Sequence, residues 1–509
     1  MGKTQHTFGR HAGIASGQGI RRRRHGSDSG ESASDFGRIG GPLPPEFVVA
    51  ENPMRRTAFS LYLLFVLAWF THLSERFAVL GMVRFDLLLL GLLTGLLVMS
   101  PNEATDVAAG AVGADASGAS RTRKLIIALL VYTILVVPFV QWPGSVLNRG
   151  LPNFIKALVF YFFTAKLITT EARLGRLLLV FVVAMTFRVL EPVYLHVTTG
   201  YWGSFAYMAG ETMARLSGSP FDVINPNGLA LVILTVIPFL HYLSSLVRFG
   251  RVAYVALLPV LLWALLLTGS RSGLLGLAAV LGMVWLKSRR KVLLTLAVAL
   301  GVAAALPLLS VDLSDRYLSI VDKHTKNAAT AAGRTAGVER DLVVAMRRPF
   351  FGHGLGTSQE ANANFGGEDQ PSHNLYTEAA QEIGFVGLTI LVAVIASIAS
   401  NLRISVRELR ATGRASPLLT RLTDAVQVWL TMNILFSFAS YGLSSYEWYF
   451  AAGLSDVARR FAADIRAGRP GSQQTVPLTA PGYRIGAAPL RSPLAPAVSP
   501  SSHGRIQVS

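Results

Sequence analysis

Cysteine is absent from the 509 residues of the chain, and charged residues make up only 15% of it. Without cysteine, disulfide bonds and thiolate metal sites are excluded. Hydrophobic residues make up 51% instead, and the mean hydropathy is +0.44. This balance is typical of a polytopic integral membrane protein and excludes an ordinary soluble domain.

Acidic residues are also scarce: 29 Asp and Glu stand against 47 Lys and Arg, which gives a net charge of +18. In a soluble protein such an excess would suggest a nucleic-acid partner. Here most of the basic residues lie in two polar tails and in short loops between apolar runs, where positive charge orients a membrane protein. We therefore expect no nucleic-acid partner.

The tails themselves carry little sequence information. The first 50 residues lack the apolar core and cleavage site of a signal peptide, so we expect the first apolar run to direct insertion. Residues 1–56 and 467–509 are rich in small residues, Pro and, in the first tail, Arg, and we predict that both are disordered and cytoplasmic. The membrane domain is then 57–466.

Within that domain, about twelve apolar runs approach the ~20 residues needed to cross a bilayer, which predicts an all-α fold. The runs are 57–73, 77–99, 125–141, 151–169, 177–197, 226–247, 252–269, 272–287, 291–310, 374–400, 419–441 and 446–463. This number puts both tails on one side, and the most basic loops fall on that side too, as the positive-inside rule requires. The long polar interval 311–373 is therefore predicted to be a periplasmic loop.

Three polar groups of residues fall on the predicted outer side, although they lie far apart in the sequence. They are 215–228, 268–273 and 371–387. Two asparagines flanking Pro226 predict a capped helix start in the first group. Polar side chains gathered at one membrane surface favour chemistry at that surface over translocation across the bilayer.

Arg271 stands alone between two apolar runs, on the side where the positive-inside rule disfavours it. It could reach phospholipid headgroups, or its guanidinium could hold an anionic ligand. Ser270 and Ser272, with the amides at a helix start, would add donors, so we favour the ligand. Arg215, in the group that also contains Asn227, is a weaker candidate because a loop arginine is usually solvated.

His373 precedes a predicted helix that begins near Asn374 and carries polar side chains into a membrane span. An imidazole can take a proton from a hydroxyl group near neutral pH, so His373 is a candidate base, with Asn374 and Tyr376 beside it. Glu378 and Glu382 on the same helix could orient other groups or could only satisfy buried polar atoms. Both interpretations stay open.

Two other patterns receive structural interpretations. Arg188 and Glu191 are one helical turn apart and could pair, and we interpret such a pair as structural rather than catalytic. The segment 352–356, Gly-His-Gly-Leu-Gly, resembles a phosphate-binding loop only superficially, because no strand–helix unit surrounds it. We expect no nucleotide site there.

Four stretches, in this order, resemble the O-antigen ligase and polymerase superfamily of bacterial inner-membrane proteins. They are RLSGSPFDVINPNG (215–228), TGSRSGLLGL (268–277), GRTAGVERDLVVAMRRPFFGHGLG (333–356) and SHNLYTEAAQEIGFVG (372–387). The resemblance covers roughly 200–400, and the SRSG turn and the last stretch are together its specific part. Val338 stands where the family usually has an aromatic residue.

The resemblance implies a GT-C-like glycosyltransferase that uses an undecaprenyl-diphosphate-linked glycan on the periplasmic face, without metal or cofactor. At the matching positions, Arg215, Arg271 and Arg334 would hold the donor diphosphate. His373 would act as a base on the acceptor hydroxyl or would position the donor. Fixed guanidinium groups can stabilise the charge that develops on a leaving diphosphate. Implied partners are a saccharide acceptor, membrane lipids and other polysaccharide export proteins.

Several functions remain in competition. A polymerase joins repeat units of O-antigen, capsule or exopolysaccharide, whereas a ligase moves a finished chain onto lipid A-core or another acceptor; we favour the polymerase because the family contains many. A transporter or flippase of lipid-linked sugars would need broken helices in matching halves, and no internal repeat is visible. A sensor or scaffold would depend on the tails, whose composition is plain.

Overall fold

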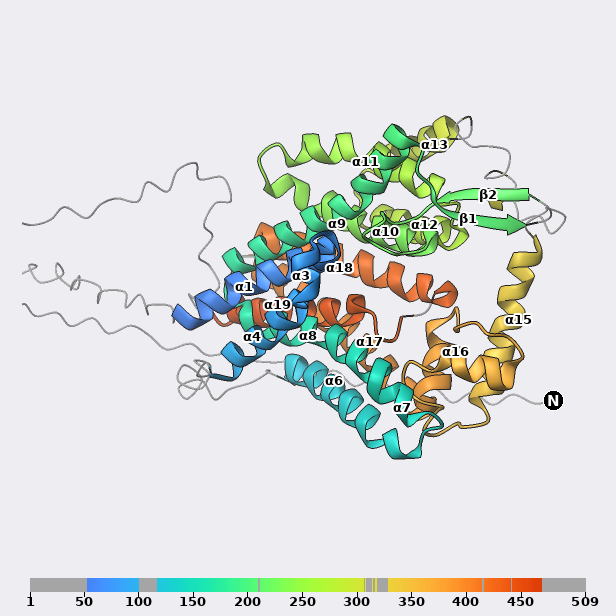
Figure 1. The fold of residues 1–509 in the computed structure, drawn as a ribbon. Coiled ribbons are helices and arrows are strands. Elements are labelled where there is room, and N and C mark those ends of the chain that lie inside the picture. Colours follow the sequence, from blue (N-terminus) through green and yellow to red (C-terminus); the bar gives the residue numbers. More distant parts are fainter. Residues whose placement is uncertain are drawn as a thin grey trace, which may run out of the picture. The chain divides into compact units, whose positions relative to one another are not determined.

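Long apolar helices form most of the structure, a computed structural model (Figure 1). It describes residues 53–99, 117–208, 211–305, 307, 314, 316–317, 328–413, 416–440 and 442–468. The predicted tails lie outside these residues, apart from 53–56 at the start of the first helix and 467–468 just after the last. The described residues all belong to one unit, Asn52–Ser509.

The main described helices follow one another with short connections. They are α1 (Pro53–Thr71), α3 (Ala78–Met82), α4 (Phe85–Met99), α6 (Ser117–Leu135), α8 (Leu151–Leu167), α9 (Glu171–Thr199), α10 (Pro226–Leu243), α11 (Gly250–Leu267), α12 (Arg271–Lys287), α13 (Lys291–Ala305), α15 (Ala328–Ala345), α17 (Leu375–Thr412), α18 (Pro417–Phe436) and α19 (Tyr446–Arg466). Shorter helical segments connect them: α2 (Leu73–Arg76), η1 (Val137–Phe139), α7 (Pro143–Ser145), η2 (Val146–Gly150), η3 (Ser244–Leu246), α16 (Ser358–Ala361), η5 (Asn362–Gly366) and η6 (Ser437–Ala439).

Five of the described helices are long and apolar enough to cross a membrane: α9, α10 with η3, α11, α17, and α18 with η6. Two shorter apolar helices, α4 and α13, accompany them. The structure thus agrees with an all-α membrane protein. The count of about twelve spans, which rests on apolar length, and the GT-C-like arrangement stay predictions.

The described chain departs from the predicted elements in two places. The run 77–99 is not one helix, because Arg84 has a left-handed φ of 47° between α3 and α4. The interval after α9 contains a hairpin of β1 (Gly203–Met208) and β2 (Glu211–Leu216), which is antiparallel with Ser204 opposite Arg215. Met213 and Arg215 are both buried, and they lie on one face of β2 because side chains two residues apart in a strand point the same way.

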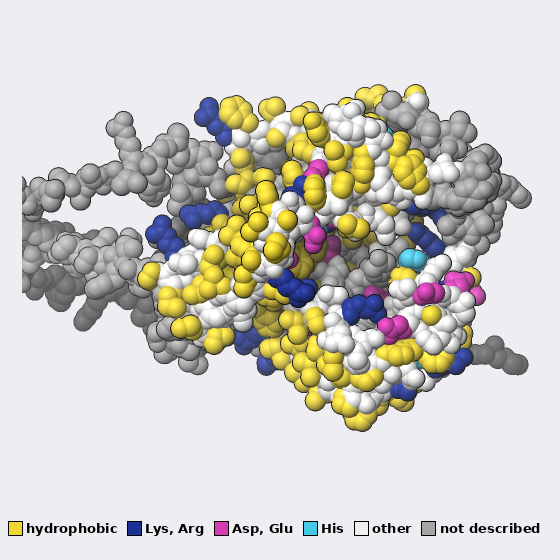
Figure 2. Space-filling view, viewed as in Figure 1, with side chains coloured by type: hydrophobic (Ala, Val, Ile, Leu, Met, Phe, Trp, Pro, Cys, Tyr) yellow, Lys and Arg dark blue, Asp and Glu magenta, His cyan; other side chains and the backbone are white. Residues whose placement is uncertain are grey.

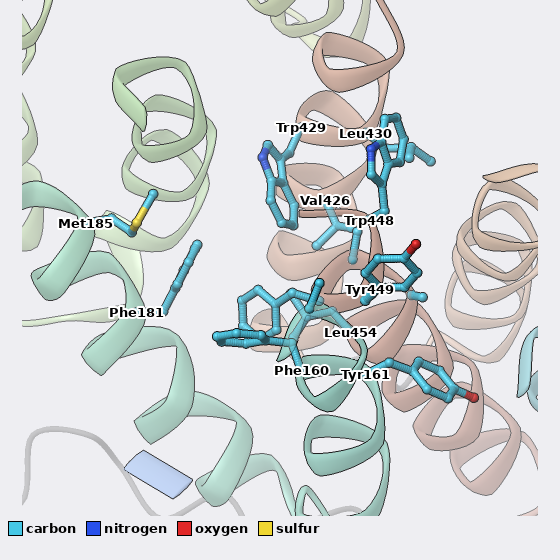
Figure 3. Close-up of a cluster of buried hydrophobic side chains, with 14 of the residues drawn as sticks. Phe160, Tyr161, Phe181, Met185, Val426, Trp429, Leu430, Trp448, Tyr449 and Leu454 are labelled. Carbon is cyan, nitrogen blue, oxygen red and sulfur yellow. The ribbon is translucent and has the colours of Figure 1, made fainter. Parts of the chain in front are cut away.

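Aromatic side chains from α8, α9, α18 and α19 fill the centre of the bundle (Figure 3). The ring of Phe181 lies 4.9 Å from that of Phe450 and 6.3 Å from that of Trp429, and Phe160 lies 6.1 Å from Phe450. Each such pair contributes about 0.5–1.5 kcal/mol beyond the burial of its surface. Trp429 Nε1 donates to Thr235 Oγ1 at 3.1 Å, so its one polar atom is satisfied.

Arg188 and Glu191, which the sequence suggested could pair, do not bind each other. Arg188 donates to both carboxylate oxygens of Asp222, at 2.7 and 2.9 Å, and Glu191 accepts a similar two-point contact from Arg76. A two-point geometry across segments is stronger than a single contact along one helix surface. The contact with Asp222 holds the loop after β2 against α9. This loop leads to the start of α10.

Helix α17 is bent where another segment crosses it. Gly384 has a left-handed φ of 67°, and a Cβ there would lie 2.2 Å from Phe350 O. Phe385 N donates to Pro349 O at 2.7 Å at the same point. Only glycine fits this close approach, so the segment after α15 is held against the first turns of α17.

Candidate active site

A cavity of about 430 Å³ opens at the end of the molecule that carries the hairpin and α15. Its lining comes from β2, the start of α10, the segment around 316, α15, the loop before α17, and η6. The lining residues are Arg215, Asn227, Arg316, Gly333, Arg334, Gly337, Val338, Arg340, Asp341, Glu368, Gln370, His373 and Phe438. Figure 2 shows a hollowed face with basic, acidic and His side chains gathered around it.

Arg215 forms one wall from the end of β2. Its Nε donates to Thr268 O at 2.8 Å, and its Nη2 donates to Asn227 Oδ1 at 3.2 Å. Asn227 Oδ1 also accepts from Ser270 Oγ at 2.8 Å. Burial, and next the charge of Arg316, lower the pKa of Arg215 to about 9. The fold therefore brings the first two predicted polar groups into direct contact.

Arg271 is the first residue of α12 and follows the turn that contains Thr268 and Ser270. Ser270 caps the helix, since its Oγ accepts from Gly273 N at 3.1 Å, and Ser272 Oγ lies 3.1 Å from it. Arg271 is buried and does not itself border the cavity, but its charge helps to lower the pKa of Arg215.

The predicted capping of the α10 start is confirmed, because Asn225 Oδ1 accepts from Gly228 N at 2.9 Å.

Arg316 is a cavity residue that sequence analysis does not single out. It is only 4% exposed, and its Nε donates to Gly269 O at 2.6 Å. Tyr317 next to it donates to Leu266 O at 3.0 Å, so the start of the long loop is fastened to the turn before α12. An Arg-Tyr pair in a polar loop is unremarkable, and no pattern in the sequence would have identified it. Arg334 faces the same space from α15, and burial lowers its pKa.

His373 borders the cavity just before α17. The following Asn374 caps the helix by accepting from Tyr376 N at 2.9 Å and from Thr377 N at 3.3 Å. Asn374 Nδ2 donates to Phe438 O at 3.3 Å, and Phe438 is itself a lining residue. Partial burial, and then the charge of Arg334, lower the pKa of His373. A lowered pKa favours the neutral imidazole, the form that a base needs.

Glu378 and Glu382 point away from the cavity toward backbone amides. Glu378 Oε2 accepts from Gly442 N at 2.7 Å and from Leu443 N at 3.1 Å. Glu382 accepts from Gly356 N at 2.7 Å and from Ser358 N at 3.2 Å. These contacts favour the second of the two interpretations, in which the carboxylates satisfy buried polar atoms and fix the loops. Tyr376 has a similar task, since its hydroxyl donates to Ile434 O at 3.1 Å.

Basic side chains outnumber acidic ones around the cavity. Arg215, Arg316 and Arg334 border it together with Arg340, Asp341 and Glu368, and Arg271 lies within electrostatic reach of Arg215. Burial lowers the pKa of Arg215, Arg271, Arg316 and Arg334. Guanidinium groups can bind an anion with many oxygen atoms through paired hydrogen bonds, so this arrangement suits such an anion. Among the described residues, no group of three His, Asp or Glu side chains could hold a metal ion.

Comparison with known proteins supports the resemblance found in the sequence. No curated protein matches the chain. The family model described as O-Antigen ligase matches residues 241–392. This stretch contains Arg271, Arg316, Arg334 and His373, but it begins after Arg215. Residues 241–392 are therefore similar to O-antigen ligases, which supports the resemblance to the O-antigen ligase and polymerase superfamily.

Proposed function

We propose that the protein is a glycosyltransferase that polymerises lipid-linked repeat units of O-antigen, capsule or exopolysaccharide at the periplasmic face of the bacterial inner membrane. One observation carries the proposal: Arg215, Arg316, Arg334 and His373 border a single cavity in a chain with an O-antigen ligase domain. A cluster of cations beside a neutral imidazole suits the transfer of a sugar from a diphosphate.

The arginines would bind the donor, an undecaprenyl-diphosphate-linked glycan. Negative charge grows on the diphosphate as its bond to the sugar breaks, and fixed guanidinium groups stabilise that charge without having to reorganise. Arg215 and Arg316 are held by backbone carbonyls at 2.8 and 2.6 Å, which keeps them in place for this task. Four arginines supply the charge that a metal ion would otherwise supply, so we expect the enzyme to be independent of metal.

His373 would act on the acceptor. An acceptor hydroxyl oxygen bonds to the anomeric carbon of the donor sugar, the bond from that carbon to the diphosphate oxygen breaks, and the hydroxyl proton passes to the imidazole. The lowered pKa of His373 supports this role, because a neutral ring can accept the proton. The acceptor in a polymerase is the terminal sugar of a second lipid-linked unit.

A ligase is the second candidate, and the description of the matching family model favours it. A ligase would use the same donor and the same base, but its acceptor would be lipid A-core or another finished carrier. The cavity residues serve both reactions equally, so the acceptor alone separates the two activities.

A genetic experiment tests the proposal. The gene is deleted and restored as wild type, His373→Ala, Arg271→Ala or the control Asp369→Asn, and surface polysaccharide is separated on a gel. We expect both site variants to lose long chains while single repeat units stay attached to their carrier, and the control to resemble wild type. Free lipid-linked polymer with a bare acceptor would instead indicate the ligase. Full chain length in both site variants would overturn the assignment of the site.

A further inference from the structure

Asp341 of α15 is a buried carboxylate at the cavity for which the proposed reaction has no task. It is 1% exposed, and it accepts hydrogen bonds from four side chains. The donors are Ser372 Oγ at 2.6 Å, Thr377 Oγ1 at 3.1 Å, Asn362 Nδ2 at 3.0 Å and Arg340 Nη2 at 3.3 Å. A carboxylate with this many donors is strongly fixed in place.

Two of these donors lie on either side of His373. Ser372 precedes it directly, and Thr377 follows in the first turn of α17. Ser372 Oγ also accepts from Asn374 N at 3.3 Å, so the backbone on the far side of His373 is tied to the same hydroxyl. The short segment that presents the imidazole is thus fastened to Asp341 from both ends.

A second layer of contacts holds Asp341 against the neighbouring elements. Gln381 Nε2 donates to Asn362 Oδ1 at 2.8 Å and to the backbone oxygen of Asp341 at 3.2 Å. Asn362 Nδ2 donates to Gln370 O at 2.9 Å, and Gln370 borders the cavity. The network therefore connects α15, η5, the loop before His373 and α17.

We propose that Asp341 is a positioning residue, which holds the His373 segment at the edge of the arginine-lined cavity. The inference rests on the proposed function of His373 as the base. A carboxylate that only fastened α15 to α17 would serve equally well anywhere along their contact. Asp341 instead binds the residues that flank His373 and borders the cavity itself.

The charge of Asp341 also acts on His373. Arg334 and Arg340 of α15 lower the pKa of His373, whereas Asp341 opposes them. Other charged groups border the cavity with His373: Glu368 in the preceding loop, Arg215 on β2, and Arg316. Glu378 of α17 instead binds the amides of Gly442 and Leu443. Replacing Asp341 by Asn should therefore lower the pKa of His373 further. Replacing Ser372 by Ala should loosen the segment that carries His373 but leave the charge of Asp341 in place.

The test measures the titration of His373 directly in the purified full-length protein. Diethyl pyrocarbonate modifies neutral imidazole, and mass spectrometry reports the extent at His373 as a function of pH, beside polymer formation from lipid-linked repeat units. We expect Asp341→Asn to shift the modification midpoint of His373 to lower pH and to slow polymerisation roughly 10- to 100-fold, because small misplacements of a catalytic group have effects of this size. Ser372→Ala should slow polymerisation less and leave the midpoint unchanged.

The outcomes separate the inference about Asp341 from the proposed function of His373. Asp369→Asn, which removes an exposed carboxylate bound to Gln359, should match wild type in both measurements. A wild-type midpoint and rate in Asp341→Asn would overturn the inference, and it would leave the proposed function standing if His373→Ala is inactive. If Asp341→Asn does not fold, a wild-type rate in Ser372→Ala would overturn the inference instead. An active His373→Ala would refute the proposed function whatever Asp341 does.

Discussion

The aromatic centre of the bundle and the arginine-lined cavity are organised in opposite ways. In the centre, Phe181, Trp429 and Phe450 pack by shape, and many neighbours share the stabilisation. At the cavity, Arg215 and Arg316 are each held by a directional bond to a backbone oxygen. The comparison indicates that stability and activity depend on different residues. Stability comes from packing that many side chains share, whereas the position of each cavity arginine depends on a few directional bonds.

The two regions also treat charge differently. A buried carboxylate of the bundle is bound by neutral donors: Tyr161 donates to Asp456 at 2.7 Å, and Asn401 donates to the other oxygen of Asp456 at 2.6 Å. At the cavity, basic side chains outnumber acidic ones: Arg215, Arg316, Arg334 and Arg340 border it with Asp341 and Glu368, and the like charges lower the pKa of Arg215. Substitutions in the bundle should therefore affect folding, and substitutions at the cavity should affect the reaction.

The sharpest test of this division, and the largest expected effect, is His373→Ala. Loss of a general base lowers the rate by about 10²- to 10⁴-fold, and the thermal unfolding temperature should stay close to that of wild type. Polymer formation from lipid-linked repeat units and unfolding in detergent give the two values. A large loss of stability with little loss of rate would contradict the division.

The converse test lies in the aromatic centre. Phe181→Ala removes a fully buried ring that packs against Phe239 and Phe450, and such truncations cost about 3–5 kcal/mol of unfolding free energy. Unfolding in detergent measures the loss, and the folded fraction should keep its rate. Val183→Ala, on the exposed side of the same helix, should change little.

A smaller effect is expected at Arg316, which the structure places at the cavity and the sequence does not single out. Arg316→Ala should weaken donor binding roughly 10- to 100-fold, since a hydrogen bond to a charged group contributes about 1.5–3 kcal/mol. Arg316→Lys keeps the charge but loses the planar fork, so it should recover only part of the affinity. The KM for the lipid-linked donor is the measurement. An unchanged KM in Arg316→Ala would remove this residue from the site.

The smallest expected effect is a shift in pH dependence. A base must be neutral, so the rate falls as pH drops through the pKa of His373, and this acid limb should lie below the ordinary range of histidine. Arg334 lowers that pKa, and Arg334→Gln should therefore move the acid limb to higher pH, whatever its effect on the maximum rate. A pH–rate profile shows the position of the limb. A shift to lower pH would contradict the assignment of His373 as the base.

How far the site could be predicted depends on whether a residue is conspicuous in its local sequence. Arg271 between apolar runs and His373 before a membrane helix are conspicuous, and both were identifiable. Arg316 and Asp341 are ordinary residues of a polar loop and an amphipathic helix, and they acquire meaning only from Gly269 and Ser372. The partner of Arg188 was not identifiable for the same reason, since it lies outside its helix.

A helical membrane protein could be predicted from the sequence, because bilayer thickness and helix capping act on neighbouring residues. The resemblance to O-antigen ligases came from short motifs, and the family model supports it. Which polar side chains share a cavity depends on the packed fold. Its bonds join residues far apart along the chain, such as Arg316 to Gly269 and Arg188 to Asp222. Hydrophobicity marks which segments are buried, but only the packed helices determine which of their loops meet.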